Sequence, residues 1–288
     1  MSRTAYVNGR YVPHQQAAVH IEDRGYQFAD GVYEVCEIAN RMVVDMAPHL
    51  DRLDRSLREL SIDWPLRRSS LELVIVETVR RNRVSNGLVY VQVTRGVAPR
   101  DHVFPVETIK PAIVVTAKSV SRAVMDAKAS KGLSVITVPE NRWERVDIKT
   151  VGLLPNALAR QSAKEQGAQE AWFVDLDGTV KEGAATNAWI VTMDGTLVTR
   201  SADNGILKGI TRATAMKAAD KLGFVVEERA FTVEEAKASK EAFVTSASSL
   251  VMPVVSIDGD VIANGNPGTV ATSLREMIFD VAEKRRAW

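Results

Sequence analysis

The amino-acid sequence predicts an α+β fold, because patterns typical of strands outnumber helical ones and the two do not alternate regularly. Asp-Gly pairs at 177–178, 194–195 and 258–259 lie between apolar runs and indicate hairpins in the second half of the chain. Helical periodicity is confined to a few segments, and residues 47–62 show it most clearly.

The chain is expected to begin with two hairpins. Asn8-Gly9 is the dipeptide that most readily adopts the positive φ angles of a type I′ turn, so residues 6–12 are predicted to form the first hairpin. In the second, the apolar run 35–38 returns as 42–44.

Two helices are expected to follow. Leucines recur at three-to-four residue spacing over residues 47–62, at Leu50, Leu53, Leu57 and Leu60. A second helix is predicted over 69–83, with Ser69 or Ser70 as its N-cap. Strands are expected at 88–94 and 111–117.

Residues 119–130 are small and polar and show no clear period, so they are expected to connect two domains, at 1–118 and 131–288. In the second domain, the predicted strands are 133–138, 171–174 and 188–192, and the predicted helices are 154–167, 210–222 and 270–284.

Composition limits the partners and the location. The 288 residues include 37 basic and 36 acidic side chains, so the chain lacks the basic excess of a nucleic-acid-binding protein, and small molecules or protein partners are expected. The single cysteine, Cys36, cannot form an intrachain disulfide and is expected to pack in the core. Since no apolar run has the length of a signal peptide or of a membrane span, we expect no membrane contact and a cytoplasmic location.

Common nucleotide and metal motifs are missing from the sequence: it has no Walker loop, no glycine-rich dinucleotide fingerprint and no HExxH. Residues 175–178 resemble the start of a calcium loop, but Thr186 stands where that loop needs a bidentate acid, so a hairpin turn explains them better. Four scattered histidines and one cysteine make no metal site, and none is expected.

Three segments carry candidate chemistry. Lys149 is either a surface lysine, the commoner case, or a partly desolvated amine that can form a Schiff base. Glu182, which small residues follow, either leaves room for a flat ligand or pairs with a neighbouring lysine in a hairpin. The helix start at 209–211 offers backbone N–H groups to an anion, unless Thr211 serves only as an N-cap.

Together with further motifs, these residues resemble the fold-type IV pyridoxal-phosphate enzymes, and specifically the D-amino acid aminotransferases. The resemblance covers almost the whole chain and rests on residues 22–35, 49–53, 90–96, 99–105, 147–149, 182–183 and 207–212. It implies a smaller N-terminal α/β domain with an antiparallel sheet and a larger, β-barrel-like C-terminal domain with flanking helices. The implied reaction is a ping-pong transfer of an amino group from a D-alanine-like amino acid to a 2-oxo acid such as pyruvate or 2-oxoglutarate.

The resemblance implies pyridoxal 5′-phosphate as the cofactor. Lys149 resembles the lysine that holds the cofactor as a Schiff base and moves the substrate Cα proton, and Glu182 resembles the acid that faces the pyridine nitrogen. The other implied cofactor contacts are Arg52, Ile210, Thr211, Ser246 and Ala247 near the phosphate and Leu207 on the ring. Helical geometry directs Arg52 away from the leucine stripe, so packing is not expected to account for it.

The resemblance further implies that Tyr33, Arg100 and His102 bind the substrate carboxylate. In the family, the stretch 99–105 reaches across a dimer interface, so an obligate homodimer with shared active sites is expected. This stretch resembles that of the D-amino acid enzymes more than that of branched-chain L-aminotransferases, aminodeoxychorismate lyases or R-selective amine transaminases, which remain alternatives, as does a non-catalytic binding protein. Ala184, Ala185 and Ala247 stand where the family often has hydroxyl residues.

Overall fold

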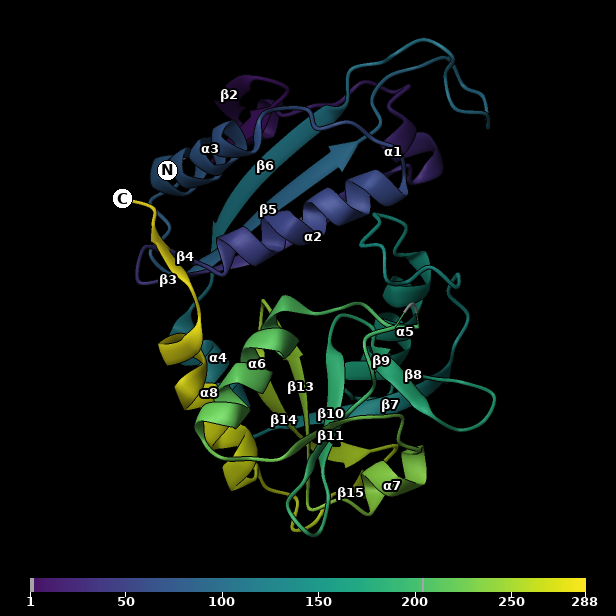
Figure 1. Ribbon diagram of the computed structural model, residues 1–288, viewed down its shortest axis with the longest axis vertical. Helices are drawn as coiled ribbons and strands as arrows, with labels where there is room; N and C mark the ends of the chain where they lie inside the picture. Colours follow the sequence, from purple (N-terminus) through teal and green to yellow (C-terminus); the bar gives the residue numbers. More distant parts are fainter. Residues whose placement is uncertain (1–2, 204) are drawn as a thin grey trace. The chain divides into compact units, whose positions relative to one another are not determined.

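The computed structural model describes residues 3–203 and 205–288, which divide into two compact units (Figure 1). Unit 1 comprises Met1–Arg122, Ile148–Gly152 and Glu283–Trp288, and unit 2 comprises Ala123–Asp147 and Leu153–Ala282. The segment that contains Lys149 therefore belongs to unit 1, although it follows residue 131 in the chain. The expected domain boundaries at 118 and 131 stay a prediction.

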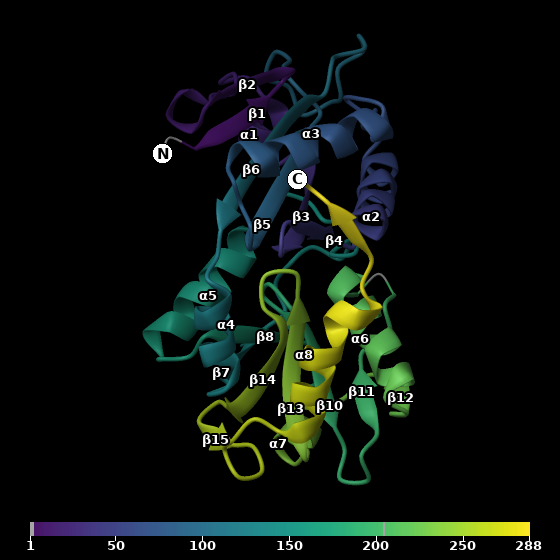
Figure 2. The ribbon, with the colours of Figure 1, turned by 90° about the vertical axis from the view of Figure 1, so that its left-hand side faces the viewer.

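Unit 1 is an antiparallel sheet with helices packed on it. Among the described residues the sheet has seven strands, in the order β16 (Lys284–Arg286), β4 (Met42–Val44), β3 (Gly31–Ala39), β5 (Gly87–Thr94), β6 (Ala112–Ser119), β1 (Thr4–Val7) and β2 (Arg10–Pro13). The C-terminal strand β16 pairs with β4 (Figure 2). The helical elements are η1 (His14–Gln16), α1 (Arg24–Phe28), α2 (Met46–Glu59) and α3 (Arg68–Arg81).

Both hairpins predicted at the start of the chain are confirmed. Asn8 and Gly9 have φ angles of 45° and 97° and join β1 to β2. Asn40 and Arg41, with φ angles of 50° and 64°, join β3 to β4. The second hairpin begins earlier than predicted, because β3 starts at Gly31.

The leucine stripe is confirmed, since Leu50, Leu53 and Leu57 of α2 lie in the core of unit 1. The predicted cap of the next helix is wrong: α3 begins at Arg68 and has no side-chain cap. Because the helix starts one residue early, Ser69 and Ser70 lie inside its first turn and not before it.

Unit 2 is a mixed sheet that curls into a half-barrel (Figure 1). Among the residues that the structure describes, its strands run in the order β12 (Val226–Glu228), β11 (Leu197–Thr199), β10 (Asn187–Val191), β13 (Glu241–Ser246), β14 (Leu250–Ile257), β7 (Leu133–Pro139), β8 (Glu170–Val174) and β9 (Val180–Gly183), with β15 (Asp260–Val261) on β14. Its helices are α4 (Arg122–Ala129), α5 (Leu154–Glu165), α6 (Ile210–Lys221), α7 (Val233–Lys237) and α8 (Thr269–Val281). Helices α6 and α8 lie side by side in both ribbon views (Figures 1 and 2) and share a core cluster with β10, β13 and β14.

The three predicted Asp-Gly hairpins are confirmed. Gly178, Gly195 and Gly259 all have positive φ angles, of 80°, 94° and 87°. They lie in the turns of the antiparallel pairs β8–β9, β10–β11 and β14–β15.

Several elements were not expected, among them helix α1 and strand β13. Strand β9 (Val180–Gly183) carries Glu182 near its end, as expected. Helix α4 lies within the stretch expected to be a connection. Its apolar stripe is short, with Met125 and Ala129 packed in the core of unit 2, so the period is hard to detect in the sequence.

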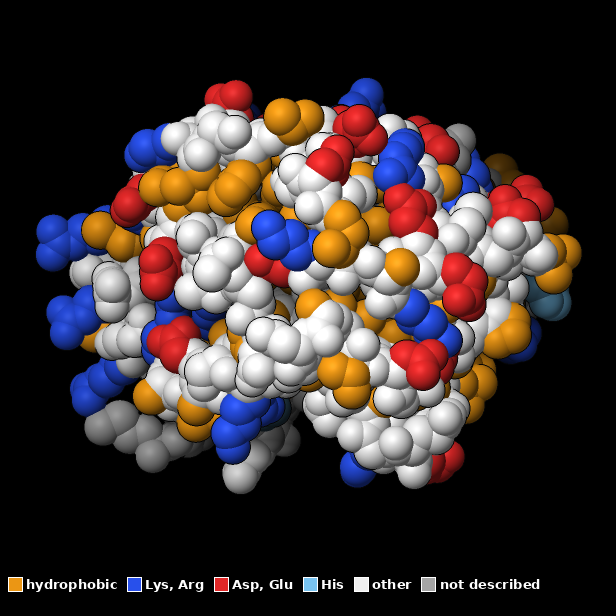
Figure 3. Space-filling model, turned by 90° about the horizontal axis from the view of Figure 1, so that it is seen from below, with side chains coloured by type: hydrophobic (Ala, Val, Ile, Leu, Met, Phe, Trp, Pro, Cys, Tyr) orange, Lys and Arg blue, Asp and Glu red, His pale blue; other side chains and the backbone are white. Residues whose placement is uncertain are grey.

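No helix among residues 3–203 and 205–288 is both long enough and apolar enough to span a bilayer. Acidic and basic side chains are interspersed on the face drawn in Figure 3, as expected for a chain with a formal net charge of +1.

Candidate active site

Lys149 lies on a short segment that pairs with the beginning of β3. Its carbonyl oxygen accepts a hydrogen bond from the Tyr33 N–H at 3.0 Å, and the Val151 N–H donates to the Gly31 carbonyl at 3.0 Å. The half-buried Lys149 amine donates to the Tyr33 hydroxyl at 3.3 Å and lies 4.3 Å from the centroid of the Tyr33 ring. The structure therefore brings together two residues that are 116 positions apart in the sequence.

Tyr90 supports Tyr33 from the next strand, β5. The two rings are stacked with centroids 5.5 Å apart, and the Tyr90 hydroxyl donates to Gln92 at 2.8 Å. Burial raises the pKa of Tyr90, so this phenol remains protonated. Tyr90 opens one of the motifs that carry the resemblance, but its neighbours in the sequence do not indicate this role.

Arg52 is held by a buried carboxylate, which corrects the expectation that packing does not account for it. Its Nε and one Nη each lie 2.8 Å from the oxygens of Glu34 on β3, and His49 Nδ1 lies 2.6 Å from the same carboxylate. His49, Arg52 and Ser56 form a second, polar stripe on α2, beside the leucines and also buried.

Burial and the neighbouring charges act in opposite directions on the pKa of Glu34. Burial by itself would raise the pKa of Glu34, but the Arg52 guanidinium and the His49 ring outweigh it and lower the pKa to about 2. Burial lowers the pKa of His49, although Glu34 opposes the shift. The Glu34–Arg52 pair is therefore ionised at neutral pH.

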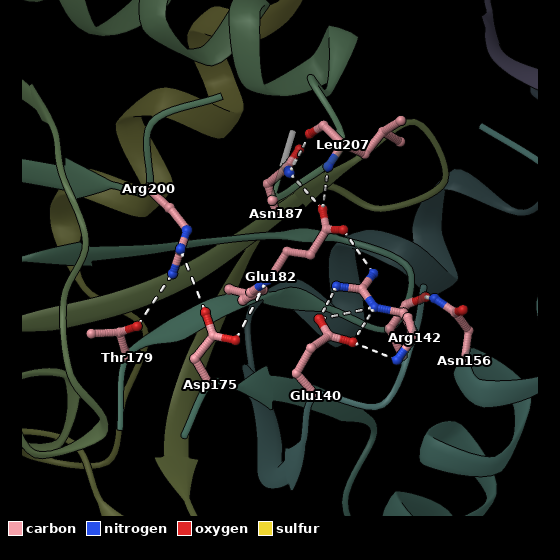
Figure 4. Close-up of polar contacts among 12 residues, drawn as sticks. Glu140, Arg142, Asn156, Asp175, Thr179, Glu182, Asn187, Arg200 and Leu207 are labelled. Atoms are coloured by element: carbon pink, nitrogen blue, oxygen red, sulfur yellow. Dashed lines mark hydrogen bonds and ion pairs between the residues drawn. The ribbon is translucent and has the colours of Figure 1, made fainter. Parts of the chain in front are cut away.

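Glu182 lies at the centre of a polar network in unit 2 (Figure 4). It is 4% exposed, and its carboxylate accepts hydrogen bonds from an Arg142 Nη at 2.8 Å, from Asn187 Nδ2 at 3.1 Å and from the Leu207 N–H at 3.1 Å. The alternative in which a neighbouring lysine pairs with Glu182 is wrong, because Lys181 pairs with Asp175 and Glu182 with Arg142.

Arg142 joins two carboxylates. Besides Glu182, it contacts Glu140 through Nε at 2.9 Å and through an Nη at 2.6 Å (Figure 4). Burial disfavours its charge, yet the two carboxylates together raise the pKa of Arg142. The cation lies over the Phe173 ring at 4.2 Å, which completes its surroundings.

The chain approaches Asn187 closely before α6 begins. Asn187 Nδ2 also donates to the Leu207 carbonyl at 2.9 Å, and a Cβ atom at Gly209 would lie 2.0 Å from Asn187 Oδ1. Only glycine fits that position. Gly209 precedes α6 without a side-chain cap, so the alternative role of Thr211 as the N-cap is wrong: Thr211 is the second residue of the helix.

Ser246 and Ala247 lie at the turn from β13 to β14. Ser246 Oγ lies 2.7 Å from Ser249 Oγ and 3.2 Å from Ser248 Oγ, so hydroxyl groups gather here in spite of Ala247.

Ala184 is buried in a small apolar cluster, and its carbonyl accepts a hydrogen bond from Asn156 at 2.7 Å.

Arg100 and His102 lie on an exposed loop of unit 1 and share one aromatic neighbour. Phe28, the last residue of α1, has its centroid 4.8 Å from Arg100 Cζ and 5.3 Å from the His102 ring. The structure thus brings together two of the three predicted carboxylate ligands, whereas Tyr33 contacts Lys149 and Tyr90.

Within its own unit, each group of predicted residues has the chemistry that pyridoxal phosphate needs. Unit 1 offers an amine at Lys149 beside a hydroxyl group, and unit 2 offers the buried carboxylate of Glu182 and the N–H groups in the first turn of the helix that starts at Ile210. An aldehyde, a pyridine nitrogen and a phosphate are the respective partners of these groups. The residues present fit the cofactor.

Comparisons with known proteins agree with the resemblance. The family model described as amino-transferase class IV matches residues 31–257. The D-alanine aminotransferase of Staphylococcus haemolyticus is 37% identical over 280 residues, covering 97% of this chain and 98% of the relative. That of Bacillus licheniformis is 37% identical over 281 residues, covering 96% and 98%.

Solved structures show the same fold. A branched-chain amino acid aminotransferase from T.th. with pyridoxamine 5′-phosphate matches with a TM-score of 0.89 at 26% identity, covering 97% of this chain and 94% of the other. One from the archaeon Thermoproteus uzoniensis with norvaline matches at 0.84 and 25% identity over the full length of both chains. The predicted fold-type IV architecture is confirmed, and enzymes of this class use pyridoxal phosphate. The chain belongs to the class IV aminotransferases.

Proposed function

We propose that this protein is a pyridoxal-phosphate-dependent transaminase that moves the amino group of a D-alanine-like amino acid to a 2-oxo acid. The observation that carries the proposal is the identity of 35–37% with D-alanine aminotransferases over nearly the whole chain. The stretch 99–105, on which the resemblance to D-amino acid enzymes rests, is part of the aligned region. Pyruvate or 2-oxoglutarate would serve as the acceptor.

Lys149 is the residue that bonds to the cofactor and then moves the substrate Cα proton. When bound, the cofactor supplies an aldehyde and a ring that accepts electrons. The Tyr33 hydroxyl, 3.3 Å from the Lys149 amine, limits where the amine can point. The stacking of Tyr33 on Tyr90 restrains the phenol in turn, so the amine has a fixed partner on β3 while it exchanges its proton.

Glu182 is the acid for the pyridine nitrogen. Arg142, Asn187 and the Leu207 N–H all donate to its carboxylate, which stabilises the ionised form. A fixed negative charge beside the ring nitrogen keeps that nitrogen protonated.

The phosphate would be held by Arg52 and by the start of α6. The Glu34 carboxylate fixes the guanidinium of Arg52 through two of its nitrogens, so the side chain does not have to be ordered when the anion binds. The N–H groups of Ile210 and Thr211 lie in the first turn of α6 and need acceptors outside the helix. Ser246 and the backbone at Ala247 would add to this group.

The substrate carboxylate would bind to Tyr33, Arg100 and His102, and we propose that the protein is a homodimer in which the loop 99–105 serves the partner's site. Unit 1 exposes apolar side chains from two segments that are joined by a β-bridge between Asp23 and Val97. These side chains are Val19, Ile21, Tyr26, Val97, Val103, Phe104 and Val106. An apolar surface of this kind is typical of an interface.

We also propose a cytoplasmic location. The single cysteine, Cys36, is 1% exposed and lies in the core of unit 1, and burial raises the pKa of its thiol. It therefore behaves as a small apolar residue and has no part in a disulfide framework of the kind found in secreted proteins.

The experiment that tests the proposed function is spectral. D-Alanine should bleach the visible absorption band of the cofactor-loaded protein, pyruvate should restore it, and L-alanine should leave it unchanged. Bleaching by L-leucine and not by D-alanine would instead support a branched-chain L-aminotransferase, the second candidate, which the names of the solved structures favour. Pyruvate release from aminodeoxychorismate without a keto acceptor would indicate a lyase.

A further inference from the structure

Arg24 is a buried arginine that the proposed chemistry leaves without a role. It is 2% exposed, and its Nε donates to Asp30 Oδ2 at 2.8 Å. Its two Nη atoms donate to three consecutive carbonyl oxygens, those of Asp101 at 2.6 Å, His102 at 3.4 Å and Val103 at 3.4 Å. The planar guanidinium has five donors in a fixed arrangement, which suits it to hold several acceptors at once.

The other end of helix α1 contacts the side chains of the same loop. Phe28, four residues after Arg24, lies against the guanidinium of Arg100 and the ring of His102, at 4.8 Å and 5.3 Å between the groups. The centroid of its ring also lies 4.8 Å from Arg24 Cζ, so Arg24 and Phe28 contact each other. One short helix thus holds both the backbone of the loop and its two predicted carboxylate ligands.

Helix α1 is itself fixed to the sheet. Asp23 caps it by accepting a hydrogen bond from the Gly25 N–H at 2.8 Å, and it accepts a second one from the Thr94 hydroxyl at 2.9 Å. Asp30, the partner of Arg24, also accepts from Arg95 Nε at 2.7 Å. The helix is therefore a rigid base for the loop.

The loop has little burial of its own. Residues 99–104 are all exposed, and the side chains of Arg100 and His102 reach solvent. Exposed loops without such support are mobile, and each mobile ligand has to be ordered when it binds a substrate. The contacts made by Arg24 and Phe28 remove part of that cost.

We propose that Arg24 and Phe28 are positioning residues that fix Arg100 and His102 for the substrate carboxylate. The inference rests on the proposed function of that loop. It predicts that the two residues affect the binding of the amino donor and the order of the loop, and that they have little effect on the chemistry at Lys149.

Two measurements on the cofactor-loaded protein test the proposal. In Arg24→Gln, amide hydrogen exchange in peptides from 97–106 should accelerate by about tenfold. KM for D-alanine should rise by about tenfold, which corresponds to roughly 1.4 kcal/mol. By contrast, kcat should change less than about threefold, because the transferred proton and the cofactor are untouched. Loop exchange and KM in Arg24→Lys should lie between the values of the wild type and of Arg24→Gln. One ammonium group can keep the ion pair with Asp30 but cannot reach three carbonyl oxygens.

Phe28→Leu is the second variant, because it retains an apolar side chain and leaves Arg24 and its hydrogen bonds in place. It should raise KM with little change in exchange at the loop backbone. Arg275→Gln is the matched control: Arg275 also donates to two carbonyls, of Ser249 and Val251, and to one aspartate. Its loss should leave exchange in 97–106 at the wild-type level.

Unchanged loop exchange in Arg24→Gln would overturn the proposal, as would equal falls in kcat and kcat/KM with KM unchanged. A wild-type protein that fails to react with D-alanine would instead overturn the proposed function. The exchange experiment does not depend on turnover and would still decide whether Arg24 anchors the loop.

Discussion

The carboxylate of Glu34 accepts hydrogen bonds from Nε and one Nη of Arg52, both at 2.8 Å, and the two side chains are 1% and 9% exposed. A side-on pair of this kind fixes the plane of the guanidinium as well as its position. Because the pair is buried, its loss should be felt in stability as well as in cofactor binding.

Replacing Glu34 with glutamine should therefore destabilise the protein by about 3–5 kcal/mol, since it leaves the Arg52 cation buried without its counter-charge. The affinity for pyridoxal phosphate, measured by titration of the visible absorption band, should fall as well. Glu77→Gln is a suitable control, because Glu77 also contacts two arginines, Arg80 and Arg81, but on the surface. There the loss should be at most about 1 kcal/mol. Equal stability losses in the two variants would contradict this account.

The same pair should make the stability of the protein depend on pH. The pKa of Glu34 is about 2 in the folded protein, against an ordinary value of 4.5. The ionised carboxylate therefore stabilises the fold fully above pH 4.5, and this stabilisation is lost as the pH falls toward 2. The difference between the two pKa values corresponds to roughly 3 kcal/mol of folding free energy. Burial also lowers the pKa of His49. The protein therefore loses further stability as the pH falls below 6.5, the ordinary pKa of a histidine.

Urea unfolding from pH 6 to pH 3 would measure this dependence. The free energy of unfolding should fall more steeply in the wild type than in Glu34→Gln, which has no carboxylate to protonate at that position. Parallel curves for the two proteins would show that other groups control the acid sensitivity.

Replacing Lys149 with alanine should lower kcat by at least about a hundredfold, because the variant loses the amine that we propose binds the cofactor and moves the Cα proton. Borohydride reduction followed by peptide mapping should label Lys149 in the wild type and give no labelled peptide from 147–152 in the variant. Lys217→Ala, at an exposed position of α6, is the control and should retain both activity and label. Activity close to wild type in Lys149→Ala would refute the assignment.

Replacing Glu182 with glutamine should lower kcat by about a hundredfold, since a neutral amide cannot stabilise a protonated ring nitrogen. The absorption of the bound cofactor should change together with the rate. Glu140→Gln is the comparison, because Glu140 shares Arg142 with Glu182 without sharing the Leu207 and Asn187 contacts. A similar loss in both variants would mean that the Arg142 network, and not the Glu182 charge, limits the reaction.

Much of the local structure could be predicted from the sequence, because the signals lie in adjacent residues. Asn8-Gly9 and the three Asp-Gly pairs each specify a turn through the φ angles that these residues tolerate. The leucine spacing in α2 likewise follows from one turn of helix. Where such signals are weak, as in α4, the prediction missed the element.

The polar partners of the candidate site could not be predicted in this way. Nothing near Glu182 in the sequence indicates that Arg142 would reach it, and nothing near Arg52 indicates Glu34. Similarly, the resemblance singled out Arg100 and His102 but gave no reason to connect them with Arg24 or Phe28.

The sequence by itself determined the turns, the main helices and the family of this protein, since each depends on residues close in the chain or on motifs in a fixed order. Only the tertiary structure decided which polar groups meet. Lys149 contacts the Tyr33 hydroxyl, 116 positions away in the sequence. Arg24 contacts the loop at 101–103, which begins 77 positions away. The physical reason is that an ionic or hydrogen-bonded contact needs a partner within a few ångströms, and strand pairing and helix packing decide which distant residues come that close.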